Sequence, residues 1–402
     1  MSDFFQNGAI TTLHALGNRD ADDLQEEIAF HAKSRPVALV LPCLYSELKG
    51  TALPRIVEKL STVSYLDSIV VSLGVAEAEE FAHAKEYFSQ LPQKTRVVWN
   101  DGPRIGAIKG EMGEAKLALG EPGKGLAAWF AYGYIISSSN ARVIALHDCD
   151  IETYEPVLLH RLVYPLVNPA MHYQFAKGYY ARVTDRLHGR VTRVFVTPLV
   201  RALKELVKGC SFLEYLDSFR YPLAGEFAMT TGLARVNKTP GDWGLEVGTL
   251  AEVYRNASSN GVCQVDLEIY YEHKHQEPSI GEPSGGLMRM CREVALALFT
   301  ALSLEGVVLD EPFFNTLRAL YLRKAQEFIS RYADLARING LNYDLHREDM
   351  LAEAFQNQLR EAGESFMVSA LGTPQIPEWN RVIDAVPGVL ETLKSAVEVD
   401  NA

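Results

Sequence analysis

The sequence predicts an α/β fold, in which a largely parallel β-sheet carries helices on both faces and a purely helical region follows. Short β-branched and leucine-rich runs alternate with amphipathic segments from about residue 36 onward, which is typical of βαβ units. Long helical periodicity replaces this alternation after about residue 284. A chain of 402 residues is long enough for one large α/β domain with additions.

The alternation can be followed segment by segment. Residues 36–45, PVALVLPCLY, predict a buried strand that runs into a loop at Pro42. After it, helical and strand-like segments follow in turn: helices over 52–63, 77–91 and 126–139, and strands over 66–74, 95–100 and 141–148. The glycine-rich stretch between Asn100 and Lys124 predicts a mobile flap rather than an extra domain.

These patterns divide the chain into three regions. We expect an N-terminal helical extension over 1–35, a sheet domain over 36–283, and a C-terminal helical region over 284–402. Within the sheet domain, 36–152 and 153–283 form two halves. We expect the C-terminal region to serve in packing, in dimerisation or as a lid. We also expect the chain to form a homodimer.

Composition excludes several classes of partner. A net charge of −12 and the lack of a Lys/Arg cluster argue against a nucleic-acid surface, while still allowing a small anionic ligand. Five scattered cysteines without a CxxC pair predict thiols in a reducing compartment and no zinc site. No segment approaches the roughly 20 apolar residues of a membrane span. We therefore expect a cytoplasmic protein with no membrane partner.

The strand over 141–148 ends at two aspartates, in the sequence HDCD. Asp148 and Asp150 lie two residues apart, and like charges so close repel unless a cation or hydrogen-bond donors offset them. Ligands bind at the carboxyl ends of parallel strands, where two carboxylates can hold a hard cation on phosphate oxygens. Two solvated loop carboxylates are the alternative.

Two histidines in YYEHKHQEP offer a further ligand. His273 or His275 could add a nitrogen to a site that accepts a borderline metal such as Mn²⁺. A surface histidine pair is the alternative interpretation.

Three further segments could meet anions or sugar hydroxyls. Lys124 opens a helix from a glycine-rich turn, where free amides and a cation can meet a phosphate. In HGRVTRVFVTPL, Arg190 offers a guanidinium fork, Thr192 a hydroxyl and Gly189 close backbone approach, which together can hold an anion. A plain helix start would explain the same residues. Glu226, in PLAGEFA, is a carboxylate among apolar residues that is costly to bury without a ligand or donor. Glu246 near a helix start is explained by dipole compensation alone.

In order along the chain, these segments resemble the glucosyl-3-phosphoglycerate synthases, retaining glycosyltransferases of the GT-A fold. The resemblance covers roughly residues 37–280, and the ordered series is more distinctive than any single member. Its segments are LPCLYSE, GKG, DCD, KGYYAR, GRVTRVFVTPL, PLAGEFA, GDWGLEVG and QVDLEIYYEHKH. The resemblance implies a Rossmann-like, mixed and mostly parallel sheet.

The resemblance also implies roles for individual residues. The nucleotide would be held by Pro42, Cys43, Leu44 and Glu47, with Ser72 nearby. Lys124 would contact the donor phosphates or sugar, Asp148 the ribose or sugar, and Glu226 the glucose hydroxyls. Asp150 and His273, with His275 as a rival, would hold Mg²⁺ or Mn²⁺ on the diphosphate. Gly189, Arg190 and Thr192 would bind the acceptor's phosphate and carboxylate. Asp150, Lys124 and Glu226 are the expected catalytic residues.

The implied reaction moves glucose from a nucleotide sugar such as UDP-glucose to the 2-hydroxyl of 3-phosphoglycerate. The first loop departs from the family, because Tyr45 and Ser46 stand where an Asn-Glu pair is usual. A GDP- or ADP-sugar, a mannosyl donor or glycerate as the acceptor therefore remain alternatives. A non-catalytic nucleotide-sugar-binding protein is another. A sugar-phosphate nucleotidyltransferase is disfavoured, because LPCLYSELKG lacks the glycine-rich basic loop that such enzymes need.

Overall fold

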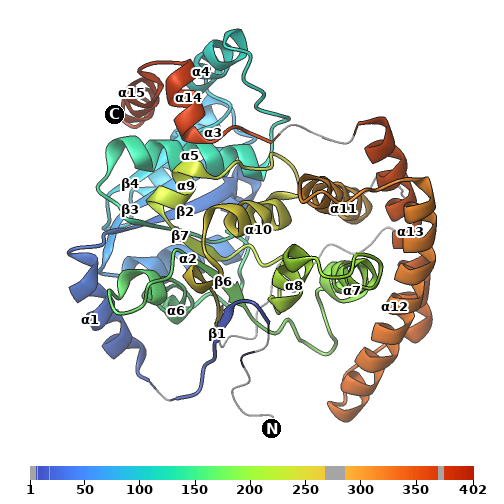
Figure 1. Cartoon of the computed structure of the whole chain (residues 1–402). Helices are drawn as coiled ribbons and strands as arrows, with labels where there is room; N and C mark the ends of the chain where they lie inside the picture. The colour runs from blue at the N-terminus through green and yellow to red at the C-terminus, as the bar shows by residue number, and fades with distance from the viewer. Residues whose placement is uncertain (1–5, 7, 18, 268–285, 370–374) are drawn as a thin grey trace.

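The computed structural model describes residues 6, 8–17, 19–267, 286–369 and 375–402. Its centre is an eight-stranded sheet in the order β1-β8-β6-β7-β5-β2-β3-β4 (Figure 1). Neighbouring strands pair in parallel except β7, which runs antiparallel to both β6 and β5. The mixed, mostly parallel sheet expected from the sequence is confirmed. The strands are β1 (Thr11–Leu13), β2 (Val37–Leu44), β3 (Leu66–Gly74), β4 (Thr95–Trp99), β5 (Val143–Leu146), β6 (Phe175–Tyr179), β7 (Phe227–Thr230) and β8 (Val262–Asp266).

Two hydrophobic cores cover the two faces of the sheet, because successive strand side chains alternate between them. Along β2, for example, Ala38 and Val40 enter one core, whereas Leu39 and Leu41 enter the other. One core joins the sheet to α4 (Pro103–Glu114), α5 (Lys124–Ser138), α9 (Thr231–Val236) and α10 (Leu245–Asn256). The other joins it to α1 (Ala21–Ala32), α2 (Ala52–Ser61), α3 (Ala78–Phe88) and α6 (Pro156–Val167). Helices on both faces are thereby confirmed.

Helix α4 corrects the expected flap between Asn100 and Lys124. Pro103 begins the helix, and Ile105, Ile108 and Met112 are buried at helical spacing. The three glycines within the helix, Gly106, Gly110 and Gly113, are exposed, and a Cβ at any of them would meet no neighbour within 4 Å. Tertiary packing has overridden the poor helix propensity of glycine.

The N-terminal segment is more than a helical extension. Helix α1 is present as expected, but β1 also adds an edge strand to the sheet by pairing in parallel with β8. This pairing joins Thr11 to Cys263, partners that are remote in sequence and that local patterns do not reveal.

The C-terminal helices occupy two separate places (Figure 1). The helices α11 (Gly286–Leu304), α12 (Glu311–Ile338) and α13 (Leu345–Val368) pack beside α7 (Thr197–Leu206) and η2 (Val191–Val196), a π-helical turn. The helices α14 (Trp379–Ala385) and α15 (Val389–Asp400) return to the other end of the sheet, against α4, α5 and β4. The tail therefore packs against η2 and α7 at one place and against α4, α5 and β4 at the other.

The remaining short elements complete the chain path. They are η1 (Tyr45–Lys49), α8 (Ser211–Ser218) and η3 (Ser259–Gly261). No helix in the described part of the chain combines the length and the apolar character needed to cross a membrane.

Candidate active site

The site is assembled at the edge where β2, β5 and β6 end. Because β7 runs antiparallel to β5 and β6, its first residues lie at the same edge as the last residues of those strands. Leu146 and Lys177 are both register partners of Phe227, so Glu226 lies next to the ends of both strands. Asp148 follows β5 and Tyr180 follows β6. The strand reversal thus brings residues 148, 180 and 226 together.

Lys124 forms the centre of this group. Its ammonium nitrogen lies 2.6 Å from Oδ1 of Asp148 and 3.3 Å from Oε1 of Glu246. Burial alone would lower the pKa of Lys124, but these two carboxylates outweigh burial and raise the pKa above its usual value. Lys124 therefore stays charged at neutral pH. Its place at the first residue of α5 adds the positive end of a helix dipole to the same spot.

Glu226 is fully buried and accepts a hydrogen bond of 2.7 Å from the hydroxyl of Tyr180. The same tyrosine ring packs edge-on against Tyr221, and Tyr221 accepts a hydrogen bond from Nη1 of Arg182. A continuous set of contacts therefore links the predicted sugar-binding carboxylate to the loop that carries the predicted acceptor residues.

Lys177, which was not predicted individually, supports the loop before Glu226. It is buried within β6 and donates a hydrogen bond to the carbonyl of Ala224. Burial lowers the pKa of Lys177 to about 8, although the nearby carboxylates of Glu246 and Glu226 oppose this shift. The signal in the sequence was a lysine inside the otherwise apolar strand FAKGYY, a residue that is rarely buried without partners.

Gly225 is required by a close approach between the loop and Asp148. A Cβ at this position would lie 2.7 Å from Cγ of Asp148, too near for any side chain. The glycine of PLAGE thus lets the main chain pass directly beside the first aspartate of the DCD sequence.

Carboxylates and ammonium groups lie together at this edge. Asp148, Glu226 and Glu246 surround Lys124 and Lys177, and Asp150 lies two residues beyond Asp148. The hard oxygen atoms of these carboxylates suit a divalent cation such as Mg²⁺ or Mn²⁺. Within the described part of the chain no three metal-ligating side chains cluster. The expected imidazole ligand, His273 or His275, lies outside the described residues.

The predicted nucleotide-binding loop lies at the end of β2, next to β5. Pro42 is half-buried, Cys43 is buried, Leu44 is exposed and Glu47 lies in η1. Tyr45, which departs from the family pattern, is fixed by a 3.0 Å hydrogen bond to Nδ1 of His83 and by the ammonium of Lys49 over its ring.

Ser72 is a register partner of Pro42, but its hydroxyl is buried and donates to the carbonyl of Ala127 at 2.6 Å. Ser72 therefore ties β3 to α5 behind the loop.

The predicted acceptor residues lie on the segment that leads into η2. Gly189 has a φ of 71°, in the left-handed region that favours glycine, and this turn places Arg190 at the start of the π-helical turn. Thr192 is buried within η2. Irregular helical turns of this kind recur at functional sites. Several basic side chains gather along the segment: Arg182, Arg186, Arg190 and Arg193.

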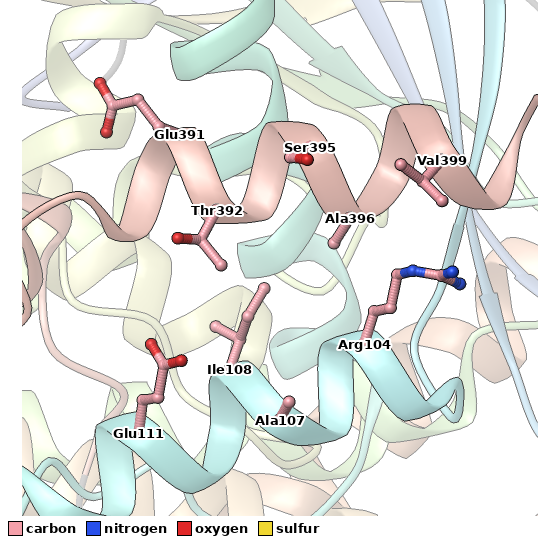
Figure 2. A pocket seen from close by; sticks show the side chains of 9 residues that line it. All are labelled: Arg104, Ala107, Ile108, Glu111, Glu391, Thr392, Ser395, Ala396 and Val399. Carbon is pink, nitrogen blue, oxygen red and sulfur yellow. The ribbon is translucent and has the colours of Figure 1, made fainter.

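A groove elsewhere on the molecule is not part of this site. It has a volume of about 440 Å³ and runs between α4 and α15, where Arg104, Ile108 and Ser395 are among its lining residues (Figure 2). None of the predicted site residues lines it.

The mixed, mostly parallel sheet has the form of the GT-A glycosyltransferases, and in open α/β sheets ligands bind outside the carboxyl ends of the strands. The chain is 46% identical to glucosyl-3-phosphoglycerate synthase of Persephonella marina over 403 residues, covering 100% of each chain. It is 38% identical to glucosyl-3-phosphoglycerate synthase of Methanococcoides burtonii, covering 99% of this chain and 98% of that protein. The chain belongs to the glucosyl-3-phosphoglycerate synthase family, as its ordered motifs indicated.

Solved structures agree at the level of the fold. The chain superposes on glucosyl-3-phosphoglycerate synthase of Mycobacterium tuberculosis in complex with Mn²⁺, UDP and phosphoglyceric acid, with a TM-score of 0.52 and 21% identity. That match covers 73% of this chain and 86% of the other. A second structure of the same enzyme, with Mn²⁺, UDP-glucose and phosphoglyceric acid, gives a TM-score of 0.53. No family model matches the chain.

Proposed function

We propose that the chain is a metal-dependent retaining glycosyltransferase that moves glucose from UDP-glucose to the 2-hydroxyl of 3-phosphoglycerate. The observation that carries this proposal is the group at the sheet edge, where Lys124 lies between Asp148 and Glu246 beside the buried Glu226. Full-length relatives at 46% and 38% identity are glucosyl-3-phosphoglycerate synthases, and a homologous fold binds Mn²⁺, UDP-glucose and phosphoglyceric acid.

On the donor side, each residue has a distinct task. The permanent positive charge of Lys124 contacts the donor phosphates or sugar, while Asp148 accepts hydroxyl hydrogen bonds from ribose or glucose. Glu226 accepts a hydrogen bond from Tyr180 at Oε2, and a carboxylate has about four acceptor sites, so Glu226 would also accept from the glucose hydroxyls. Pro42, Cys43, Leu44 and Glu47 hold the nucleotide.

Asp150 and His273, with His275 as the rival, would hold the divalent ion. When bound, the ion would supply Lewis-acid neutralisation of the departing diphosphate, so that no protein side chain is needed as a general acid. The described residues contribute carboxylate oxygens at this place, which are the ligands that hard divalent cations prefer. They therefore suit this group chemically.

On the acceptor side, Arg190 offers a guanidinium to the phosphate or carboxylate of 3-phosphoglycerate, and Gly189 and Thr192 shape the adjoining turn. The 2-hydroxyl of the acceptor attacks the anomeric carbon on the face that the diphosphate leaves. Its proton passes to the leaving phosphate oxygen, and the new glycosidic bond replaces the bond to phosphate. No protein carboxylate is needed as a nucleophile.

A second candidate donor differs in its nucleotide base. Tyr45 is held in the first loop by His83 and Lys49, at a position where the family usually has another residue type. A GDP- or ADP-glucose donor is therefore the alternative to UDP-glucose.

We also propose a homodimer in the cytoplasm, and a domain division at about residues 35 and 283. Apolar side chains exposed near the α12–α13 turn, among them Leu335, Ile338 and Leu345, support association with a second copy. All five cysteines are free, which is consistent with a reducing compartment.

One experiment tests the proposal directly. The protein is incubated with Mg²⁺ or Mn²⁺ and UDP-, GDP- or ADP-glucose, with and without 3-phosphoglycerate, and released nucleotide and sugar product are measured. We expect nucleotide release that requires 3-phosphoglycerate and yields an α-linked glucoside from an α-linked donor. Release that is indifferent to the acceptor, or no release with any donor, would contradict the proposal.

A further inference from the structure

The C-terminal helices reach the acceptor segment through a buried carboxylate. Glu348 lies in the first turn of α13, and its side chain is only 8% exposed. Oε1 of Glu348 is 3.4 Å from Nε of Arg190, and Oε2 is 3.4 Å from Nη1 of Arg193. One carboxylate therefore bridges two arginines that stand three residues apart.

Arg193 is fixed on all sides. Its Nε donates to the carbonyl of His188 at 2.9 Å, and its guanidinium lies 5.0 Å from the ring centre of Tyr332. Arg193 and Glu348 thus form a buried ion pair within the helical region, with side-chain exposures of 9% and 8%.

Arg190 differs from Arg193 in two ways. Its side chain is 23% exposed, and its closest approach to Glu348 is through Nε. A guanidinium that a carboxylate approaches at Nε can still present its Nη1 and Nη2 edge to another anion. That edge is the part of an arginine that forms paired hydrogen bonds with a phosphate or carboxylate.

A second contact fixes the other end of the acceptor segment. Nδ2 of Asn342, in the turn between α12 and α13, donates to Oδ2 of Asp185 at 3.0 Å, and the main-chain amide of Asn342 donates to the carbonyl of Asp185 at 2.8 Å. The turn and the first residues of α13 therefore hold residues 185–193 at both ends.

We propose that Glu348 is a positioning residue, which orients the guanidinium of Arg190 toward the anionic acceptor. The helical tail is then a part of the acceptor site rather than a packing appendage. This inference rests on the proposed function, because it takes Arg190 as the residue that meets the acceptor.

The test measures steady-state kinetics of Glu348→Gln and Glu348→Asp with both substrates. In Glu348→Gln the Arg190 guanidinium loses its anchor, so we expect the KM for 3-phosphoglycerate to rise about 10-fold, with the KM for UDP-glucose unchanged. Glu348→Asp keeps the charge between the two arginines, and we expect an intermediate acceptor KM. Glu353→Gln, an exposed glutamate on the same helix, is the matched control and should behave as the wild type.

A double-mutant cycle separates positioning from general stabilisation. In an Arg190→Ala background, Glu348→Gln should cause no further rise in the acceptor KM, because its effect passes through Arg190. If Glu348→Gln does not fold, as judged by its melting temperature, the same double-mutant cycle is measured with Glu348→Asp in its place.

The outcomes are distinguishable. An unchanged or lowered acceptor KM in folded variants, or an equal effect with and without Arg190, overturns the positioning role while leaving the proposed function intact. Failure of the wild-type chain to use 3-phosphoglycerate overturns the proposed function itself.

Discussion

Lys124 and Asp148 form an ion pair of 2.6 Å between the first residue of α5 and the loop after β5. Under the proposed function, the pair joins two segments that contact the donor together. Lys124→Ala should therefore lower kcat/KM for UDP-glucose by at least about 10-fold, given the roughly 1.5–3 kcal/mol of a hydrogen bond to a charged group. The acceptor KM should change little. Lys116→Ala, in the segment before α5, is a control that keeps wild-type kinetics.

The metal role of Asp150 gives a second prediction. Asp150→Ala should abolish transfer while the melting temperature stays close to that of the wild type, since the side chain is only partly buried. Excess chelator should abolish wild-type activity, and added Mg²⁺ or Mn²⁺ should restore it. Asp67→Ala, which removes an exposed aspartate from β3, should leave activity unchanged. Full turnover in the presence of chelator would contradict the metal role.

Arg190→Ala should change the KM for the acceptor and leave the KM for the donor almost unchanged. Because the guanidinium is expected to meet the acceptor's anionic groups, the KM for 3-phosphoglycerate should rise about 10- to 100-fold. The KM for UDP-glucose should stay within twofold of the wild type. Equal increases in both constants would remove Arg190 from the acceptor site.

Gly225 offers a test that adds only a methyl group. In Gly225→Ala the new Cβ would collide with the Asp148 carboxylate, so that either the aspartate or the loop of Glu226 must move. We expect kcat/KM for UDP-glucose to fall about 100-fold, as misplacement of a positioned group can cost that much. Gly232→Ala in α9 is the matched control, since its Cβ would meet no neighbour within 4 Å. Wild-type kinetics in Gly225→Ala would show that the close approach is dispensable.

His160 should make stability dependent on pH. Its imidazole is buried in α6, with Nδ1 2.9 Å from the hydroxyl of Tyr65, and burial lowers its pKa from 6.5 to about 4. Between these two values the unfolded chain binds a proton that the folded chain does not. The free energy of unfolding should therefore fall as the pH drops from about 6.5 to about 4, by up to about 3 kcal/mol from this residue.

Urea unfolding at pH 7, 6 and 5 checks this expectation. The decrease should be smaller in His160→Gln than in the wild type, and unchanged in His172→Gln, where the histidine is exposed. Parallel curves for wild type and His160→Gln would contradict the assignment.

Much of the sheet could be predicted because its strands are buried on both faces. The range expected for β3 coincides with the structure, and Lys124 does begin a helix. The prediction failed where long-range packing decides the structure. Helix α4 forms despite three glycines because Ile105, Ile108 and Met112 pack into the core, and β1 exists only because β8 is beside it.

In the site, too, local features could be predicted from the sequence and long-range partners could not. The sequence placed Asp148 and Lys124 at the ends of their elements, and the structure brings them into contact. The lysine inside the apolar run FAKGYY indicated a buried side chain with a partner, but not that the partner is the loop before Glu226. No local pattern indicated that Glu348 would reach Arg190 from a helix more than 150 residues away. Such partners are set by tertiary structure rather than by spacing.

The edge strand β4 is completed by the last residues of the chain. The side-chain amide of Asn401 accepts from the main-chain amide of Val97 and donates to its carbonyl, both at 2.8 Å, as one more strand would. An exposed sheet edge invites pairing with other chains. During synthesis that edge stays uncovered until Asn401, 304 residues further along the chain, has been made.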